Sequence, residues 1–137
     1  MEYSQSDFSD ELNKMIKSTE QSFVQHCSFL MNEFEPMFKK KNQRLHLELI
    51  KNGINLFTPG YVSLVLVEIE PHLEKYKIKI RIPIWKCQRT ILGIPVTNNI
   101  PCSKITGTLN TLENVKNVFK EFILDNLKKD YAMVAFI

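Results

Sequence analysis

Glu68, Glu70 and His72 alternate along a segment that is predicted to be extended. Side chains two residues apart in a strand point to the same side, so two carboxylates and an imidazole would face one cation there. The same geometry, however, places both glutamates opposite Lys77 and Lys79 of the following strand. A proline between Glu70 and His72 is also expected to end the strand before the histidine. The pattern favours ion pairs over a metal site, and we expect no bound metal.

The histidine and cysteine residues suggest a second kind of chemistry. A nucleophilic cysteine needs a histidine within hydrogen-bond reach, and His26 is adjacent to Cys27. Neighbours on a helix point about 100 degrees apart, and Cys27 falls on an apolar stripe, so we expect a packed, unreactive thiol. Cys87 and Cys102 have no companions at zinc-ligand spacing. Three widely spaced cysteines do not form a disulfide framework, so reduced thiols are expected.

Other catalytic signatures are missing. The four glycines form neither a phosphate-binding loop nor a dinucleotide fingerprint, and no nucleophile elbow is present. A nuclease would need clustered carboxylates to hold a divalent ion, and residues 37–107 contain few acids. We therefore expect a protein that is not an enzyme and that uses no cofactor.

The net charge of +3 averages three unlike segments. Residues 1–36 contain two lysines and seven acids, residues 37–107 contain twelve basic residues and four acids, and residues 108–137 are balanced at four and four. A basic middle segment attracts acidic partners, whether nucleic acid or protein, and speeds their association. The alternative is that it pairs internally with the acidic first segment.

Within this segment, basic side chains recur at alternate positions of a predicted strand. Lys77, Lys79 and Arg81 share one face, and Trp85 has the same parity. Arginine and aromatic side chains anchor protein interfaces. The segment from Gly93 to Lys104 is long enough to be a contact loop. The predicted partner-binding residues are Lys77, Lys79, Arg81, Trp85, Lys86, Arg89, Asn98 and Asn99.

The elements that position these residues follow from hydrophobic periodicity. Apolar or small residues at steps of three or four from Phe8 predict a long helix, with Ser6 or Ser9 as N-cap. Pro36 is expected to stop or kink this helix near Glu35. Alternation predicts a strand at residues 45–49. A turn at residues 52–53 and a return strand at 54–57 follow.

Residues 61–70 and 76–84 predict two further strands, which pair best with Glu68 opposite Lys79 and Glu70 opposite Lys77. Residues 85–92 predict another strand, 93–101 a loop, and the apolar stripe after Thr111 a second helix. The tail, 132–137, is expected to form a last strand or helical turn. The predicted fold is α+β in one domain, residues 1–137. It has a long N-terminal helix, an antiparallel β-meander of about four to five strands, and a C-terminal helix packed on one sheet face.

No segment approaches the roughly 20 apolar residues that span a bilayer, so no membrane association is expected. The amino terminus is acidic and polar, unlike a secretory signal, so the expected compartment is the cytoplasm.

These features favour a stoichiometric protein-binding module. The leading hypothesis is an immunity protein or antitoxin, a toxin inhibitor whose basic sheet face and loop occlude the active site of a cognate toxin with an acidic surface. One alternative is a nucleic-acid-binding module that uses the basic stripe for phosphate contacts and Trp85 for base stacking. Another is a dimeric adaptor or chaperone-like protein that associates through the first helix. Either a monomer or a homodimer is compatible with the sequence.

Overall fold

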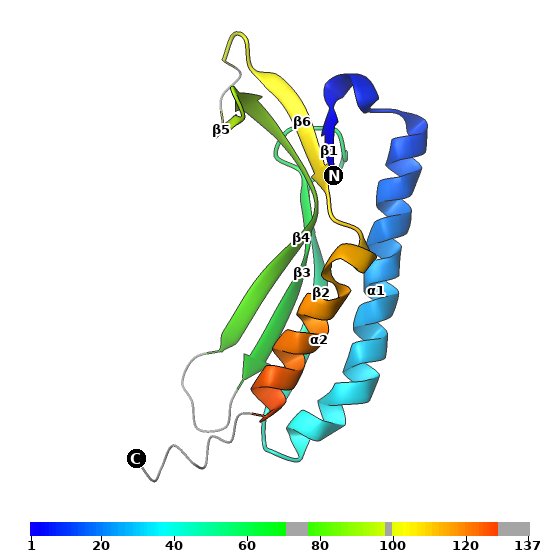
Figure 1. The fold of residues 1–137 in the computed structure, drawn as a ribbon, viewed down its shortest axis with the longest axis vertical. Coiled ribbons are helices and arrows are strands. Elements are labelled where there is room, and N and C mark those ends of the chain that lie inside the picture. The colour runs from blue at the N-terminus through cyan, green and yellow to red at the C-terminus, as the bar shows by residue number, and fades with distance from the viewer. Residues whose placement is uncertain (71–76, 98–99, 129–137) are drawn as a thin grey trace.

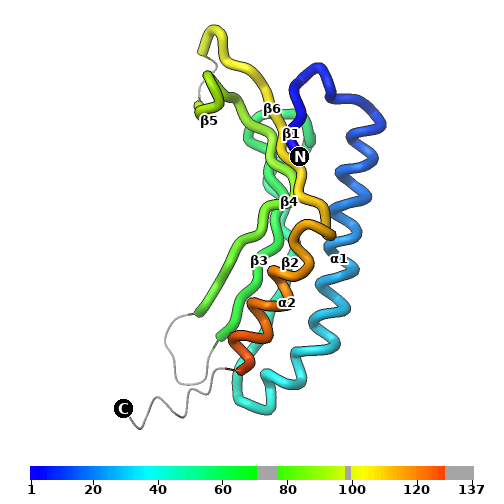
Figure 2. Tube along the Cα trace, viewed as in Figure 1, coloured from blue at the N-terminus to red at the C-terminus, as the bar shows by residue number. Residues whose placement is uncertain are grey.

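The computed structural model describes residues 1–70, 77–97 and 100–128 and has the α+β architecture predicted from the sequence (Figure 1). Its antiparallel sheet of six strands has the order β1-β6-β4-β3-β2, with β5 paired to β4. Both helices lie on the same side of the sheet (Figures 1 and 2). The elements are β1 (Glu2–Ser4), a 3-10 turn (Gln5–Asp7), α1 (Asp10–Lys39), β2 (Arg44–Asn52), β3 (Val62–Glu70), β4 (Ile78–Ile91), β5 (Ile94–Val96), β6 (Lys104–Leu109) and α2 (Leu112–Lys128).

Helix α1 begins where expected and ends later. The Ser9 hydroxyl accepts a hydrogen bond from the Leu12 amide at 3.1 Å, which caps the first turn, and Asp10 and Glu11 lie beside the positive end of the helix dipole. The sequence predicted a stop or a kink near Glu35, and the stop is wrong, because α1 continues through Pro36 to Lys39. A proline removes one amide donor, but its own carbonyl still accepts, here from the Lys40 amide at 3.2 Å. One missing bond in the last turn does not stop a helix whose Phe38 is buried.

Strands β3 and β4 pair in the predicted register. Glu68 lies opposite Lys79, and Ile69 lies opposite Ile78. The expected return strand at residues 54–57 is wrong: β2 pairs with β3, and residues 53–60 form the connecting turn. Asn55 stabilises this turn by accepting a hydrogen bond from the Phe57 amide at 2.9 Å. Gly53, with φ of 117°, occupies the left-handed backbone region that the turn requires.

Strand β4 is a single strand of 14 residues that joins the two strands predicted at 76–84 and 85–92. Ser63 pairs with Trp85 and Leu64 pairs with Pro83, so Ile84 is an extra residue, a β-bulge. A bulge changes which residues face the core. Ile84 and Trp85 are both fully buried, and the prediction that Trp85 shares the basic face is wrong.

Three short strands complete the sheet, one near the amino terminus and two in the second half of the chain. β1 and β6 were not expected, and β5 lies inside the predicted loop. Helix α2 is confirmed, and its buried Phe119 packs edge-on against Phe23 of α1, with ring centroids 5.9 Å apart. The tail 132–137 lies outside the described residues. In the described part of the chain, no helix is both long and apolar enough to cross a membrane.

Candidate functional site

The candidate site is the outer face of the sheet, opposite the helices. Of the predicted residues, Lys77, Lys79, Arg81 and Lys86 are exposed and Arg89 is half-buried. Asn98 and Asn99 lie outside the described residues. Because alternate residues of a strand are about 7 Å apart, Lys79 and Arg81 present adjacent cations on this face. Trp85 leaves the set because it is in the core.

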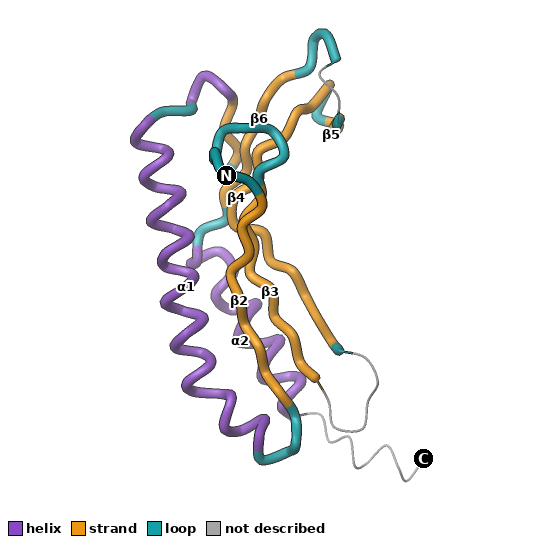
Figure 3. The backbone as a smooth tube through the Cα atoms, turned by 180° about the vertical axis from the view of Figure 1, so that it is seen from behind, coloured by secondary structure: helices purple, strands orange, loops and turns teal. Residues whose placement is uncertain are grey.

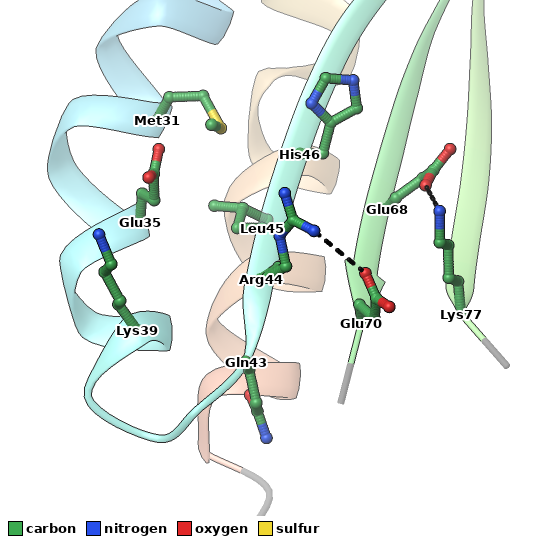
Figure 4. Close-up of a pocket in the computed structure, with 10 residues that line it drawn as sticks. All are labelled: Met31, Glu35, Lys39, Gln43, Arg44, Leu45, His46, Glu68, Glu70 and Lys77. Carbon is green, nitrogen blue, oxygen red and sulfur yellow. Dashed lines mark ion pairs between the residues drawn. The ribbon is translucent and has the colours of Figure 1, made fainter. Parts of the chain in front are cut away.

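At one end of this face, acids and bases pair with each other (Figure 4). Lys77 Nζ lies 3.4 Å from Glu68, Arg44 lies 4.0 Å from Glu70, and His46 Nε2 lies 3.2 Å from Glu48. The expected Glu70–Lys77 pair is replaced, since β2 brings Arg44 opposite Glu70. Exposed pairs of this kind contribute at most about 1 kcal/mol each. They neutralise the basic stripe at this end.

A depression of about 460 Å³ extends from these pairs to α1. Figure 4 shows Glu35 and Lys39 of the helix on one side of β2, and Glu68 on the other. Its lining mixes positive and negative side chains. No group of three or more metal-ligating side chains occurs among residues 1–70, 77–97 and 100–128, and His72 is outside these ranges. The charged side chains that line the depression include the Arg44–Glu70 and Lys77–Glu68 ion pairs.

The middle of the face keeps free positive charge. In the part of the chain that the structure describes, neither Lys79 nor Arg81 has a carboxylate within 4.0 Å. Arg81 lies opposite Leu66, which is only 7% exposed although it lies on the outer face. Long side chains such as arginine cover apolar neighbours with their methylene groups while the charge stays in water. A guanidinium group that lies over an apolar side chain is typical of a protein interface.

At the other end lies a groove of about 740 Å³, formed where the β2–β3 turn approaches β4 and β5. Hydrogen bonds between Gly60 and Cys87 (2.8 Å) and between Cys87 and Tyr61 (2.9 Å) hold the turn against β4. The groove is lined by Thr58–Val62, Lys86–Arg89 and Pro95–Thr97. It therefore brings the predicted residues Lys86 and Arg89 together with part of the predicted contact loop.

Two exposed apolar residues lie beside this groove; Ile94 belongs to the predicted contact loop, whereas Leu92 was not anticipated. Leu92 and Ile94 are 96% and 65% exposed at the turn between β4 and β5. Leu92 has φ of 51°, which a leucine seldom adopts, and it is followed by Gly93 at 80°. A Leu-Gly pair between two β-prone segments was the available signal for a tight hairpin here.

The thiol of Cys27 is buried, as the sequence predicted. Burial raises the pKa of Cys27 from 9.0 to about 11, and burial raises that of Cys87 to about 11, partly offset by Arg89. Burial, and then the charge of Lys116, lower the pKa of His26 below 6.5. Cys102 is exposed. A neutral buried thiol is a poor nucleophile, so the His26–Cys27 pair is a packing feature.

A buried polar cluster was not anticipated. Glu20 of α1 is 2% exposed and accepts a hydrogen bond from the Tyr61 hydroxyl at 2.8 Å, with Lys51 Nζ 3.6 Å away. Burial and the contact with Glu20 raise the pKa of Tyr61. Both carboxylate oxygens have partners, and the cluster links α1 to both strands that flank the turn. Its role is structural, since it has no free group to act on a substrate.

Searches against protein-family models, curated proteins and solved structures find no match for this chain. The surface itself is therefore what indicates a function.

Proposed function

We propose that the chain is a non-enzymatic protein-binding module, of the immunity or antitoxin class, that neutralises a cognate toxin by occluding its active site. The observation that supports this proposal best is the free pair of cations, Lys79 and Arg81, beside the buried Leu66 on an open sheet face. Arginines over apolar neighbours are frequent hot spots of binding energy. The adjoining groove, with Lys86 and Arg89, extends the same surface.

The mechanism follows from the charge of this surface. A basic face accelerates association with an acidic partner and fixes its orientation, and dissolved salt screens the attraction. The exposed Leu92 and Ile94 supply apolar contacts at the rim. A toxin covered in this way loses access to its substrate without any chemical step.

The alternative of nucleic-acid binding loses one of its two supports. Single strands bind to basic grooves in which bases stack on aromatic side chains. The sequence offered Trp85 for stacking, and Trp85 is fully buried. The cations alone would provide only phosphate contacts.

The test is an affinity pull-down at low salt from the cells that make this protein, with nuclease-treated and untreated halves. The charge reversal Lys79→Glu/Arg81→Glu is compared with Lys14→Glu/Lys17→Glu on α1, which changes the net charge equally at two exposed positions. We expect one stoichiometric protein that survives nuclease, is lost with the first variant and is kept with the second.

Isolation of that protein then allows its toxicity and its neutralisation to be measured. An association rate insensitive to salt would contradict occlusion by the basic face. Recovery of nucleic acid alone, lost after nuclease treatment, would overturn the proposal in favour of the alternative.

A further inference from the structure

We propose that the free edge of β2 is a homodimer interface, at which it pairs with β2 of a second copy of this chain. Within the described residues, β2 pairs with β3 alone and stands last in the strand order. The strand is nine residues long, contains no proline, and pairs with β3 without a bulge. Proteins usually protect such an edge with prolines, bulges or inward-pointing charges.

The side chains of β2 make the strand complementary to itself. Those facing the helices are apolar from Leu45 to Leu49, and the first inward charge is Lys51, which lies 3.6 Å from Glu20. The outer side chains include a base and an acid two residues apart, His46 and Glu48. A strand with this pattern can meet an antiparallel copy of itself with apolar residues on one face and, on the other, an imidazole opposite a carboxylate.

The pattern selects one register. A two-fold axis that falls on a residue keeps inward side chains together, whereas an axis between two residues mixes the faces. With the axis at Leu47, each His46 lies opposite Glu48 of the second copy. On the inner face, Leu47 meets itself and Leu45 meets Leu49, so the strands share the segment from Arg44 to Ile50.

The neighbouring registers are worse. An axis at Glu48 opposes the two Glu48 carboxylates and sets the inward Lys51 against Leu45 of the second copy. An axis at His46 opposes two imidazoles and shortens the paired segment. Like charges directly opposite each other destabilise a strand pair. An axis at Leu49 pairs seven residues, as the axis at Leu47 does, but it sets the inward Lys51 against Leu47 of the second copy. The axis at Leu47 therefore gives the longest pairing that keeps the inner face apolar and opposes no like charges.

There is space beside the edge for incoming side chains. A hollow of about 630 Å³ lies between α1 and β2, which run alongside each other in Figure 3. Its helix wall includes the short side chains Ser28 and Asn32, and Leu47 and Leu49 line its strand side. The inward leucines of the second copy would enter this hollow and cover apolar surface that is open in the single chain.

This dimer has a consequence for the outer face. The two-fold axis of an antiparallel pair is perpendicular to the sheet, so both outer faces would lie on the same side of one continuous sheet. The Lys79 and Arg81 cations of both copies would then be available together.

The experiment measures the mass of the purified full chain by sedimentation equilibrium, at protein concentrations from low micromolar to several hundred micromolar. We expect a reversible dimer. His46→Glu sets two pairs of carboxylates opposite each other by symmetry, and Glu48→Lys removes the carboxylate opposite each His46. Each change should raise the dissociation constant about tenfold. The double variant His46→Glu/Glu48→Lys exchanges the charges and should restore the wild-type value. Both side chains are about half exposed, so the folded chain should tolerate these changes.

Glu121→Lys on the exposed face of α2 is the matched control, and it should leave the dissociation constant unchanged. Hydrogen exchange adds a second readout, since the edge amides of residues 44–50 should become more protected as concentration rises. A monomer at every concentration would overturn the proposal. A dimer whose dissociation constant is the same in the wild type and in the single variants would also overturn it. Protection of these amides that does not depend on concentration would also overturn it, because a segment of the same chain would then cover the edge.

Discussion

Replacement of Gly107 by alanine should destabilise the fold strongly, for a reason visible in the contact with Trp85. A Cβ atom at residue 107 would lie 2.0 Å from Cη2, 2.5 Å from Cζ2 and 2.8 Å from Cζ3 of the indole. Carbon atoms prefer a separation of roughly 3.5–4.0 Å, so the methyl group and the ring cannot both keep their places. The indole is itself fixed, because Nε1 donates a hydrogen bond to the Leu56 carbonyl at 2.7 Å.

The size of the effect combines three contributions. Overpacking a core costs about 1–3 kcal/mol. If the ring moves, its buried N–H loses the Leu56 carbonyl, which costs about 1–3 kcal/mol more. Alanine recovers roughly 0.5–1 kcal/mol of the disadvantage of glycine in a strand. Gly107→Ala should therefore lower the free energy of unfolding by about 1–5 kcal/mol, a large share of the roughly 5–15 kcal/mol of an ordinary domain.

The assay is urea denaturation followed by far-ultraviolet circular dichroism, performed as a double-mutant cycle with Trp85→Phe. The three atoms that clash belong to the six-membered part of the indole, and phenylalanine reaches less far. In the Trp85→Phe background, Gly107→Ala should cost less than about 1 kcal/mol. Equal costs in the two backgrounds would refute the steric argument. If Gly107→Ala alone does not fold, recovery of the fold in the double variant gives the same answer.

Three further predictions concern the buried polar groups and thiols. In the native state a thiol reagent should modify only the exposed Cys102, and Cys27 and Cys87 should react only after unfolding, as peptide mapping would show. Burial raises the pKa of both buried thiols to about 11, so the fold is stabilised by their neutral forms below about pH 9, and this stabilisation is lost as the pH rises toward 11. Urea titrations should therefore give a lower free energy of unfolding at about pH 10.5 than at about pH 8. Equal values at the two pH values would contradict the prediction. Tyr61→Phe should cost about 1–3 kcal/mol in thermal or urea unfolding by removing the donor to buried Glu20, whereas Tyr3→Phe, whose hydroxyl bond is exposed, should cost little.

The sequence predicted those helices and strands in which apolar and charged residues are spaced regularly. The register of β3 and β4 follows from alternating glutamates and lysines, and α2 follows from a clear apolar stripe. Pro36 was overestimated as a helix end, since the sequence does not show that Phe38 lies against a core. The short strand β1 depends on β6 for its hydrogen bonds, and β6 in turn pairs with β4. Three residues next to the amino terminus carry too little pattern to show that pairing in advance.

The largest error in the predicted site has one physical cause, the extra residue Ile84. Strict alternation from Arg81 would place Trp85 outward, but the bulge moves it to the inner face, where Gly107 leaves room for its ring. The alternation of residue types along one strand cannot reveal a bulge, because the extra residue is recognised only when the strand is aligned with its partner. The basic residues before the bulge, Lys79 and Arg81, keep their predicted face, so the prediction of the site remains useful there.

The two proposed surfaces can be tested separately, because one is the edge of β2 and the other is on β4, with β3 between them. Reversal of Lys79 and Arg81 should abolish partner binding without changing the dimer dissociation constant. The single variants His46→Glu and Glu48→Lys should raise the dissociation constant of the dimer. If the partner also has two binding sites, those changes should reduce its apparent affinity in proportion to dimer loss, because joined sites act at a high effective concentration. If it has one site, partner affinity should not change, and the edge of β2 would then serve assembly rather than recognition.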